Sequence, residues 1–307
     1  MQYSWNGNDG SYTDPTQWTP QDVPLYGAST SALIQSGTVT LTDIRPNDIS
    51  ITLSGLTAAT QPNLVLDNAA LGPGVFISLI PPGVLSLAPG IGFATITVEG
   101  YDTVEGKISM GGSKLPPDNL TIAIAPYSQL NQEGTISVLD NSILRVSGTG
   151  DAPATLNNDG AINIGGGSAI ISADVIGSGT MALLTVPFYG ASLELSGAVA
   201  ATQHVSFDFD YFNVRESLRL DNPSTFHGVI DGFTDVTNDS ITLANTQATS
   251  AYFAQVTPDA GALLLLDGQS VVGALTVTGT HAANAYGVSS NTDGSTTVRP
   301  VFPIPGS

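Results

Sequence analysis

Hydrophobic and polar residues alternate along the chain in short runs, and glycine or an Asn-Asp pair bounds most of them. The pattern is clearest between Leu156 and Gly197, where the runs include Ala161–Ile164, Ala169–Ile171 and Ser192–Leu195. In this stretch β-branched residues and leucines recur two positions apart, which is the period of a strand, and no window within it has room for a helix of about ten residues. The pattern therefore predicts short strands separated by turns.

This strand-turn pattern repeats. The segment Leu130–Val138 matches Leu156–Ile164 position by position, 26 residues apart, and Glu105–Met110 is a third copy 28 residues before the first of these. One turn of a parallel β-helix holds roughly three strands of four to six residues plus three turns, which occupies about this length. We therefore expect a stack of coils, each coil being one turn of the helix.

Equivalent positions of the three copies are predicted to lie above one another in adjacent coils. The expected apolar column consists of Ile108, Ile136 and Ile162. The expected coil corners are Gly106, Gly134 and Gly160. At a corner, glycine can take a backbone conformation that other residues resist.

The two ends of the chain differ from the repeats. Residues 1–45 contain Trp5, a loop rich in Gly, Asn and Asp, and then Trp18. Two interpretations remain open: the tryptophans cover the exposed end of the sheet stack, or they form an aromatic platform for sugars. In residues 246–299, the run Leu263–Leu266 is followed by Asp-Gly and another apolar run, which predicts an antiparallel hairpin.

The sequence thus predicts an all-β fold. We expect a right-handed parallel β-helix over residues 1–245 with an N-terminal cap in 1–45, and an antiparallel capping region in 246–299. The tail 300–307 carries three prolines and is predicted to be a linker or an extended strap.

Composition narrows the possible partners. Only 11% of residues are charged, and 7 Lys and Arg against 26 Asp and Glu give a net charge of −19. Nucleic acid is not an expected partner, since no basic surface is available to release counterions from phosphate. Anionic membranes are disfavoured for the same reason, and no apolar run is long enough for membrane insertion.

The chain has no cysteine, so neither disulfides nor thiol chemistry contribute to it. The first residues, Met1–Trp5, lack a basic region and an apolar core, and we expect no signal peptide there.

The opening Trp…Gly…Trp…Pro and the copies of N-x-[ED]-G-x-I resemble the passenger segments of bacterial autotransporter-type and other large secreted surface proteins. The copies are carried by Asn131, Glu133, Gly134 and Ile136 and by Asn157, Asp159, Gly160 and Ile162. The order of short motifs between residues 192 and 243 is similar to a module near the end of such passengers. The resemblance implies a secreted or bacterial cell-surface protein that works in adhesion, aggregation or biofilm matrix. It supplies no catalytic residues.

One pair of carboxylates is a candidate for catalysis. Asp208 and Asp210 lie two apart on a predicted strand, so their side chains share one face at about 6.6 Å. This is near the lower end of the carboxyl separation in inverting glycosidases. The alternative is that Phe207, Phe209 and Tyr211 are buried while the two aspartates are solvated. The scarcity of Lys and Arg weighs against an enzyme for acidic polysaccharides.

Calcium is the possible cofactor. Four oxygen-bearing side chains, Asp231, Asp235, Asn238 and Asp239, lie within nine residues, as in a calcium-binding loop. The alternative is that these Asp and Asn residues only form a turn before the strand at Ile241, since neither EF-hand spacing nor a Gly-Asp nonapeptide repeat is present. The three histidines, His204, His227 and His281, are scattered and do not predict a zinc site.

We therefore expect a non-enzymatic extracellular or cell-surface protein, an adhesin or biofilm-matrix component. Its partners would be itself or cell-surface and matrix glycans, and complementary ends would allow fibres. The alternative is a polysaccharide-active β-helix enzyme, a glycoside hydrolase or lyase of the kind that phage depolymerases represent.

Overall fold

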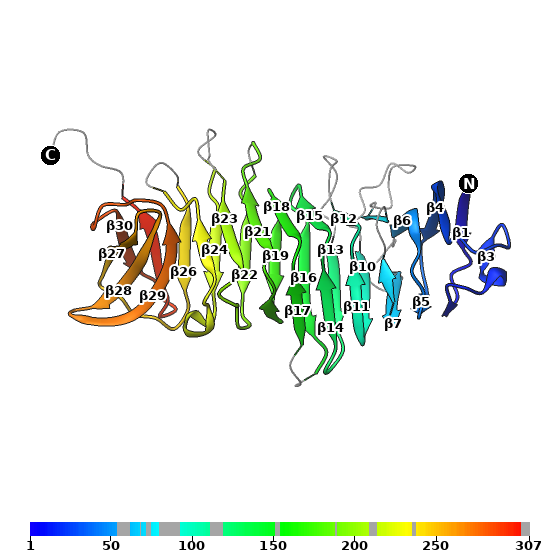
Figure 1. Ribbon diagram of the computed structural model, residues 1–307, viewed down its shortest axis with the longest axis horizontal. Helices are drawn as coiled ribbons and strands as arrows, with labels where there is room; N and C mark the ends of the chain where they lie inside the picture. The colour runs from blue at the N-terminus through cyan, green and yellow to red at the C-terminus, as the bar shows by residue number, and fades with distance from the viewer. Residues whose placement is uncertain are drawn as a thin grey trace.

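Short strands of successive coils pair side by side and form an all-β parallel β-solenoid of about seven turns, with antiparallel strands near the C-terminus. The fold class predicted from the sequence is confirmed. In the computed structural model the strands stack along one long axis, with the two termini at opposite ends (Figure 1). The described residues are 1–53, 62–67, 69–71, 75–79, 93–110, 119–150, 154–187, 189–208, 214–234 and 238–301. Within these ranges, no helix has the length and apolar character to cross a membrane.

Three sheets run along the solenoid. Sheet A comprises, in spatial order, β3 (Trp18–Thr19), β1 (Gln2–Trp5), β4 (Tyr26–Ile34), β6 (Asn47–Leu53), β9 (Phe76–Leu79), β12 (Lys107–Met110), β15 (Thr135–Leu139), β18 (Ala161–Gly165), β21 (Thr180–Leu184), β23 (His204–Phe207), β25 (Val229–Asp231), β29 (Ser270–Thr278), β28 (Ala260–Asp267) and β27 (Ser250–Thr257). Sheet B comprises β2 (Gly10–Ser11), β5 (Thr38–Thr42), β7 (Asn63–Asp67), β10 (Phe93–Glu99), β13 (Asn119–Ile124), β16 (Ile143–Gly148), β19 (Ser168–Ile171), β22 (Ser192–Leu195), β24 (Ser217–Leu220), β26 (Ser240–Leu243), β31 (Thr296–Pro300) and β30 (Tyr286–Ser290). Sheet C comprises β8 (Ala70–Leu71), β11 (Tyr101–Val104), β14 (Gln129–Gln132), β17 (Thr155–Asn158) and β20 (Asp174–Ile176). Two short 3₁₀ turns are η1 (Pro15–Gln17) and η2 (Pro223–Thr225).

The core is a set of apolar columns, one inward residue per coil. Ile108 pairs with Ile136 and Ile136 with Ile162, so the predicted column is confirmed. The column continues through the sheet, and none of its members is more than 1% exposed: Ile77, Ile108, Ile136, Ile162, Met181, Val205, Ile230 and Val277. Because inward side chains stack on equivalents in the next coil, the core has the length of the solenoid.

The predicted corner glycines lie where sheet C passes into sheet A, but the expected reason for them is wrong. Gly106, Gly134 and Gly160 are not among the residues with positive φ. A Cβ on Gly134 would lie 1.9 Å from the carbonyl oxygen of Gly106, and one on Gly160 would lie 2.2 Å from that of Gly134. Close approach of the backbone between coils, rather than a left-handed conformation, requires glycine there.

Polar side chains also enter the interior near this corner. Gln132, Asn158 and Gln203 are 0% exposed. Asn158 Nδ2 donates to Gln203 Oε1 at 2.9 Å, and Gln203 Nε2 donates to the Asn158 carbonyl at 2.7 Å. By contrast, neither polar atom of the Gln132 side chain has a hydrogen-bond partner in the described part of the chain.

The Gln132→Leu variant is therefore expected to be more stable than the wild type by about 1 kcal/mol. A buried amide without partners carries a desolvation cost, which leucine of similar size removes. Asn158→Leu is the matched control and should be destabilised, since it removes the Nδ2 donor of Asn158 and leaves the buried Gln203 Oε1 without this bond. Urea unfolding of both variants measures the two changes. A Gln132→Leu variant as unstable as Asn158→Leu would contradict this explanation.

The N-terminal end is closed by a small aromatic core. Trp18 packs edge-on against Trp5 and Tyr12, with ring centroids 4.9 and 5.0 Å apart. Trp5 is 6% exposed and Trp18 0%. Both indole N–H groups are bonded within the cap, that of Trp18 to the Tyr12 carbonyl at 2.8 Å and that of Trp5 to the Asn8 carbonyl at 2.7 Å. These tryptophans are thus core residues of the cap, and their rings do not form an exposed platform.

Antiparallel strands continue the two long sheets at the C-terminal end. β29 pairs parallel with β25 and antiparallel with β28, and the β28–β29 hairpin turns at the predicted Asp267-Gly268. β31 pairs antiparallel with β26, which ends at Leu243. The antiparallel region 246–299 therefore extends sheets A and B. Pro300 belongs to β31, and residues 302–307 of the predicted tail lie outside the described residues.

Candidate functional site

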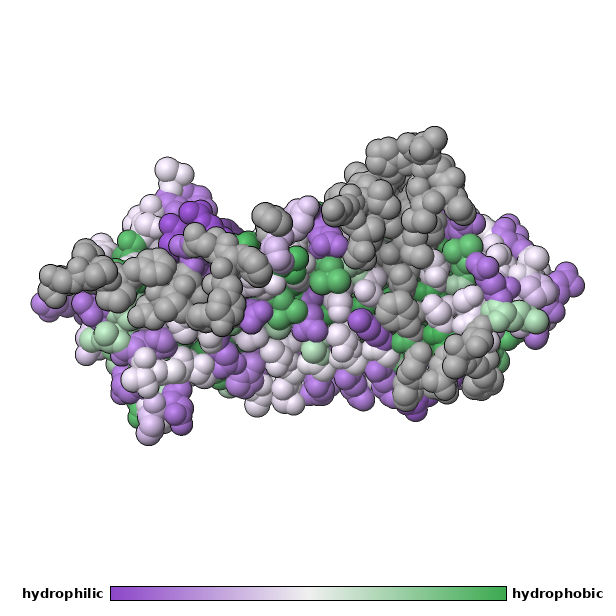
Figure 2. Space-filling view, turned by 90° about the horizontal axis from the view of Figure 1, so that it is seen from above, coloured by the Kyte–Doolittle hydropathy of each residue, from purple (hydrophilic) through white to green (hydrophobic). Residues whose placement is uncertain are grey.

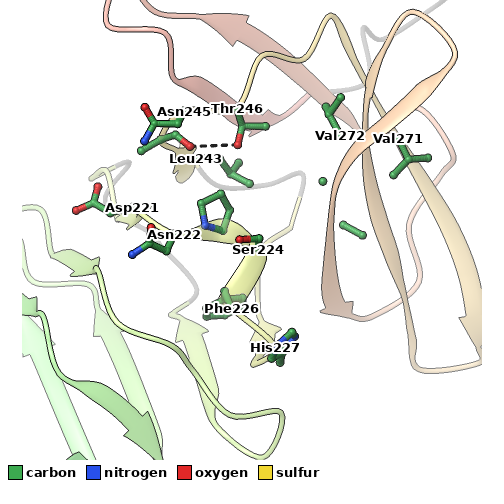
Figure 3. A pocket seen from close by; sticks show the side chains of 14 residues that line it. Asp221, Asn222, Ser224, Phe226, His227, Leu243, Asn245, Thr246, Val271 and Val272 are labelled. Carbon is green, nitrogen blue, oxygen red and sulfur yellow. Dashed lines mark hydrogen bonds between the residues drawn. The ribbon is translucent and has the colours of Figure 1, made fainter. Parts of the chain in front are cut away.

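A groove of 630 Å³ lies at the junction between the last coils and the C-terminal hairpin. Figure 3 shows Val271 and Val272 of β29 on one side, facing Ser224 and Leu243 on the other. The fourteen lining residues combine polar and apolar side chains: Asp221, Asn222, Pro223, Ser224, Phe226, His227, Leu243, Ala244, Asn245, Thr246, Val271, Val272, Gly273 and Ala274. Because none of them is Lys or Arg, the groove suits an uncharged ligand better than an anion.

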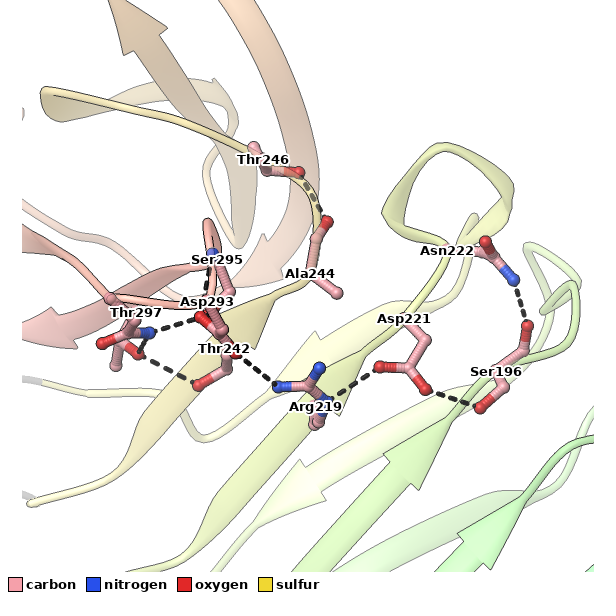
Figure 4. A network of polar contacts seen from close by, with 11 residues as sticks. Ser196, Arg219, Asp221, Asn222, Thr242, Ala244, Thr246, Asp293, Ser295 and Thr297 are labelled. Atoms are coloured by element: carbon pink, nitrogen blue, oxygen red, sulfur yellow. Dashed lines mark hydrogen bonds and ion pairs between the residues drawn. The ribbon is translucent and has the colours of Figure 1, made fainter.

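A polar network holds one rim of this groove (Figure 4). Arg219 Nε donates to Asp221 Oδ1 at 2.8 Å, and Ser196 Oγ donates to Asp221 Oδ2 at 2.8 Å. The Arg219 guanidinium also lies 3.9 Å from the Asp293 carboxylate, which links β24 to the loop before β31. Both oxygens of Asp221 thus accept hydrogen bonds that fix the loop.

A second, shallower depression of 490 Å³ adjoins the groove and shares Asn245, Thr246 and Val272 with it. Asn245 has a φ of +53°, a conformation that asparagine tolerates better than most residues. Together the two depressions form one continuous hollow that is open to solvent.

Three carboxylates come together at the turns between sheets A and B. Glu216 Oε1 accepts from Thr185 Oγ1 at 2.9 Å, and Glu216 Oε2 accepts from the Asp208 amide at 3.1 Å. The Glu216 amide donates to Asp239 Oδ1 at 3.1 Å. This carboxylate cluster joins three consecutive coils, because Thr185, Glu216 and Asp239 come from successive turns.

Burial sets the protonation of Glu216 in the carboxylate cluster. Glu216 and Asp239 are 0% exposed. Desolvation, reinforced by the negative charges of Asp239 and Asp208, raises the pKa of Glu216 from its usual 4.5 to about 8. At neutral pH Glu216 is therefore mostly protonated.

Of the candidate catalytic pair, only Asp208 lies within the described residues, so its pairing with Asp210 stays a prediction. Asp208 is exposed, whereas its carboxyl neighbour Glu216 is closed off from solvent. Asp210 lies outside the described residues. A general acid must reach the bond that it protonates. The geometry of the carboxylate cluster thus favours a structural role.

The calcium candidates are divided between two places. Asp231 Oδ2 lies 2.7 Å from His204 Nδ1 on the outer face of sheet A, and Asp239 belongs to the buried carboxylate cluster. Asn238 precedes Asp239, and Asp235 lies outside the described residues. Among the residues that the structure describes, no group of three or more His, Cys, Asp or Glu could hold a metal ion. Calcium binding stays a prediction.

The histidines remain apart, as their spacing suggests. His227 lines the groove, and His281 packs edge-on against Phe253 at 4.9 Å with its Nε2 at 2.9 Å from the Thr278 carbonyl. His204 is paired with Asp231.

The outer face of sheet A carries two columns of mostly small, uncharged side chains in register, of which Ser137 and Ala182 are buried. Along sheet A, Ser109 pairs with Ser137, Ser137 with Asn163, and the column continues through Ala182 and Ser206 to Asp231. A neighbouring column consists of Lys107, Thr135, Ala161, Thr180, His204 and Val229. On the face seen from above in Figure 2, hydrophilic residues spread along the length and hydrophobic ones occur in separate groups.

The chain matches no protein-family model and no curated protein sequence. Function must therefore be argued from the faces, the groove and the carboxylate cluster themselves.

The two-residue strand period in the sequence indicates that Glu216 and Asp239 are buried, although neither was predicted to be. Glu216 lies two positions before Leu218, and Asp239 two before Ile241, so both are in phase with the inward residues of their strands. Extending the two-residue period one step past each strand would have placed them inside.

Proposed function

We propose that the protein is a non-enzymatic, secreted or cell-surface protein, an adhesin or matrix component, whose lateral faces bind glycans or neighbouring molecules. The observation that carries this proposal is the outer face of sheet A. From β12 to β25 its two columns contain mostly Ser, Thr, Ala and Asn, with Lys107 at one end and the hydrogen-bonded pair of His204 and Asp231 at the other. The half-buried hydroxyl and amide side chains of these columns, Ser109, Thr135, Asn163, Thr180 and Ser206, offer hydrogen-bonding groups to a ligand, and successive coils lie about 4.8 Å apart.

The test is incubation of the full chain with a panel of neutral and acidic polysaccharides. Binding is measured by co-sedimentation, and product formation by new reducing ends or unsaturated sugars. We expect retention of the protein on at least one polysaccharide and no products. Product release that disappears in the Asp208→Asn variant would contradict the proposal and support an enzyme.

The enzyme alternative has one specific observation in its favour. Asp208 is exposed, and its backbone amide contacts Glu216, whose pKa of about 8 is suited to a general acid. Against it stands the burial of Glu216, at 0% exposure. We therefore keep polysaccharide cleavage as the second candidate.

Self-association into fibres needs surfaces other than the sheet ends. At the N-terminal end sheet A finishes in the two-residue antiparallel β3, and at the C-terminal end it finishes in the antiparallel hairpin β27–β28. Short or antiparallel edge strands hinder the addition of another parallel coil. We expect any assembly to use the lateral faces, which electron microscopy of concentrated protein would reveal as side-by-side rather than end-to-end contacts.

A further inference from the structure

Two tyrosines are exposed at one corner of the solenoid, where sheet B passes into sheet C. Tyr101 begins β11 and is 69% exposed, and Tyr127 lies in the turn before β14 and is 79% exposed. Tyr101 pairs in register with Gln129, two residues after Tyr127, and the Gly100 amide donates to Ser128 Oγ at 2.8 Å. The two rings therefore project from adjacent coils at the same corner.

The backbone at Tyr127 is strained. Its φ is +61°, in the left-handed region that bulky side chains rarely occupy. At the same corner of the preceding coil the left-handed residue is Gly100, with a φ of +128°. Glycine would serve the turn without strain, so the tyrosine is not required by the fold. Strain of this kind is typical of residues held in place for binding.

Beside the tyrosines, amide side chains form a fixed ladder on the outer face of sheet C. Gln129 Nε2 donates to Asn131 Oδ1 at 2.6 Å, and Asn157 Nδ2 donates to the same oxygen at 3.2 Å. Because Asn131 Oδ1 accepts both bonds, the three amides are held in register across two coils. Their remaining donors and acceptors lie on a partly exposed face, where ordering them for a ligand costs little side-chain entropy.

Acidic residues border this face on its far side. Glu105, Glu133 and Asp159 precede the corner glycines of three consecutive coils, and Glu105 is paired with Arg45. Glu133 and Asp159 are exposed. With a net charge of −19 over the chain, this border repels polyanions.

We propose that these five residues, Tyr101, Tyr127, Gln129, Asn131 and Asn157, form a binding surface for a neutral polysaccharide. This Tyr-amide surface deepens the proposed function and rests on it. The tyrosine rings offer flat apolar surfaces for the C–H faces of sugar rings, and the amides offer donors and acceptors for hydroxyl groups. The rise of about 4.8 Å between coils is close to the length of one sugar unit, so the polymer lies along the solenoid axis.

The experiment is affinity electrophoresis of the full chain in gels that contain dextran, mannan or hydroxyethyl cellulose as neutral polymers, and alginate or polygalacturonate as polyanions. The variants are Tyr101→Ser with Tyr127→Gly, and Asn131→Ala. Tyr252→Ser is the matched control, since Tyr252 is 47% exposed on the C-terminal hairpin, away from this surface.

We expect retardation of the wild type by a neutral polymer and a loss of affinity of about tenfold in the tyrosine double variant. Tyr252→Ser should behave as the wild type. Because glycine suits the left-handed turn, the melting temperature of Tyr127→Gly should equal or exceed that of the wild type, which separates lost binding from unfolding.

The results of this experiment distinguish a failure of the Tyr-amide surface from a failure of the proposed function. A wild type that binds a neutral polymer, with unchanged affinity in the double variant, overturns the Tyr-amide surface and leaves the proposed function standing. Retardation by polyanions alone overturns the neutral ligand class. Cleavage of the polymer in the gel overturns the proposed function itself.

Discussion

The Gly134→Ala variant is expected to lose more than about 4 kcal/mol of folding free energy, or to fail to fold. The new Cβ would lie 1.9 Å from the Gly106 carbonyl oxygen and 2.7 Å from the Glu105 carbonyl carbon, both backbone atoms. That oxygen already accepts a hydrogen bond from the Thr135 amide at 3.0 Å. The coils cannot separate at this corner without breaking the backbone hydrogen bonds between them. The clash therefore cannot be removed by a small local shift.

The matched control is Gly10→Ala in β2. A Cβ at Gly10 would have its nearest neighbours at 3.6 and 3.7 Å, which is ordinary contact. We expect this variant to change the free energy of unfolding by less than about 1 kcal/mol. Urea unfolding followed by circular dichroism measures both variants. Equal stability of Gly134→Ala and Gly10→Ala would contradict the close approach of the coils.

The second large effect is a loss of stability as the pH rises. The pKa of Glu216 is about 8 in the folded state and 4.5 in its usual state. The folded protein therefore binds more protons than the unfolded chain between these values, and its stability falls as the pH rises from 4.5 to 8. Integrated over this window, the loss reaches up to about 4 kcal/mol.

Glu216→Gln should remove this dependence. Glutamine keeps an oxygen for the Thr185 hydroxyl and carries no charge to repel Asp208 and Asp239. At pH 8.5 the variant is expected to be more stable than the wild type, and at pH 5 the two should be similar. Glu133→Gln, at an exposed glutamate, is the control and should keep the wild-type slope. Parallel pH profiles of wild type and Glu216→Gln in thermal melts would contradict the assignment.

The coil architecture could be predicted from the sequence because residues that stack in successive coils are of the same type at equivalent positions. The repeat aligned Ile108, Ile136 and Ile162, and the structure pairs them in that register. The glycine corners were located by the same alignment. Their reason was missed, because a clash between Gly134 and Gly106 depends on the distance between coils and not on either residue's own conformation.

The candidate sites were harder to predict from the sequence than the fold. Glu216 contacts Thr185 and Asp239, which lie 31 and 23 residues away, and only the fold brings them together. Gln132 at the end of β14 and Gln203 just before β23 follow the two-residue period of the inward side chains, but inward positions are expected to be apolar, so neither was predicted to be buried. The groove arises where a hairpin closes over the last coils, and no local pattern specifies that junction.

The sequence singled out two tryptophans that are buried, and it did not single out the two tyrosines that are exposed. Trp5 and Trp18 flank a loop rich in Gly, Asn and Asp, where an aromatic platform was one expectation, but the fold buries both. Tyr101 and Tyr127 carry no motif, and their importance depends on exposure and on the left-handed backbone at Tyr127.

The most direct test of the account is calorimetric titration of the full wild-type chain with a soluble neutral polysaccharide, followed by an assay for reducing ends in the same sample. The account predicts saturable heat of binding and no increase in reducing ends. An increase in reducing ends over time, abolished by Asp208→Asn, would contradict it.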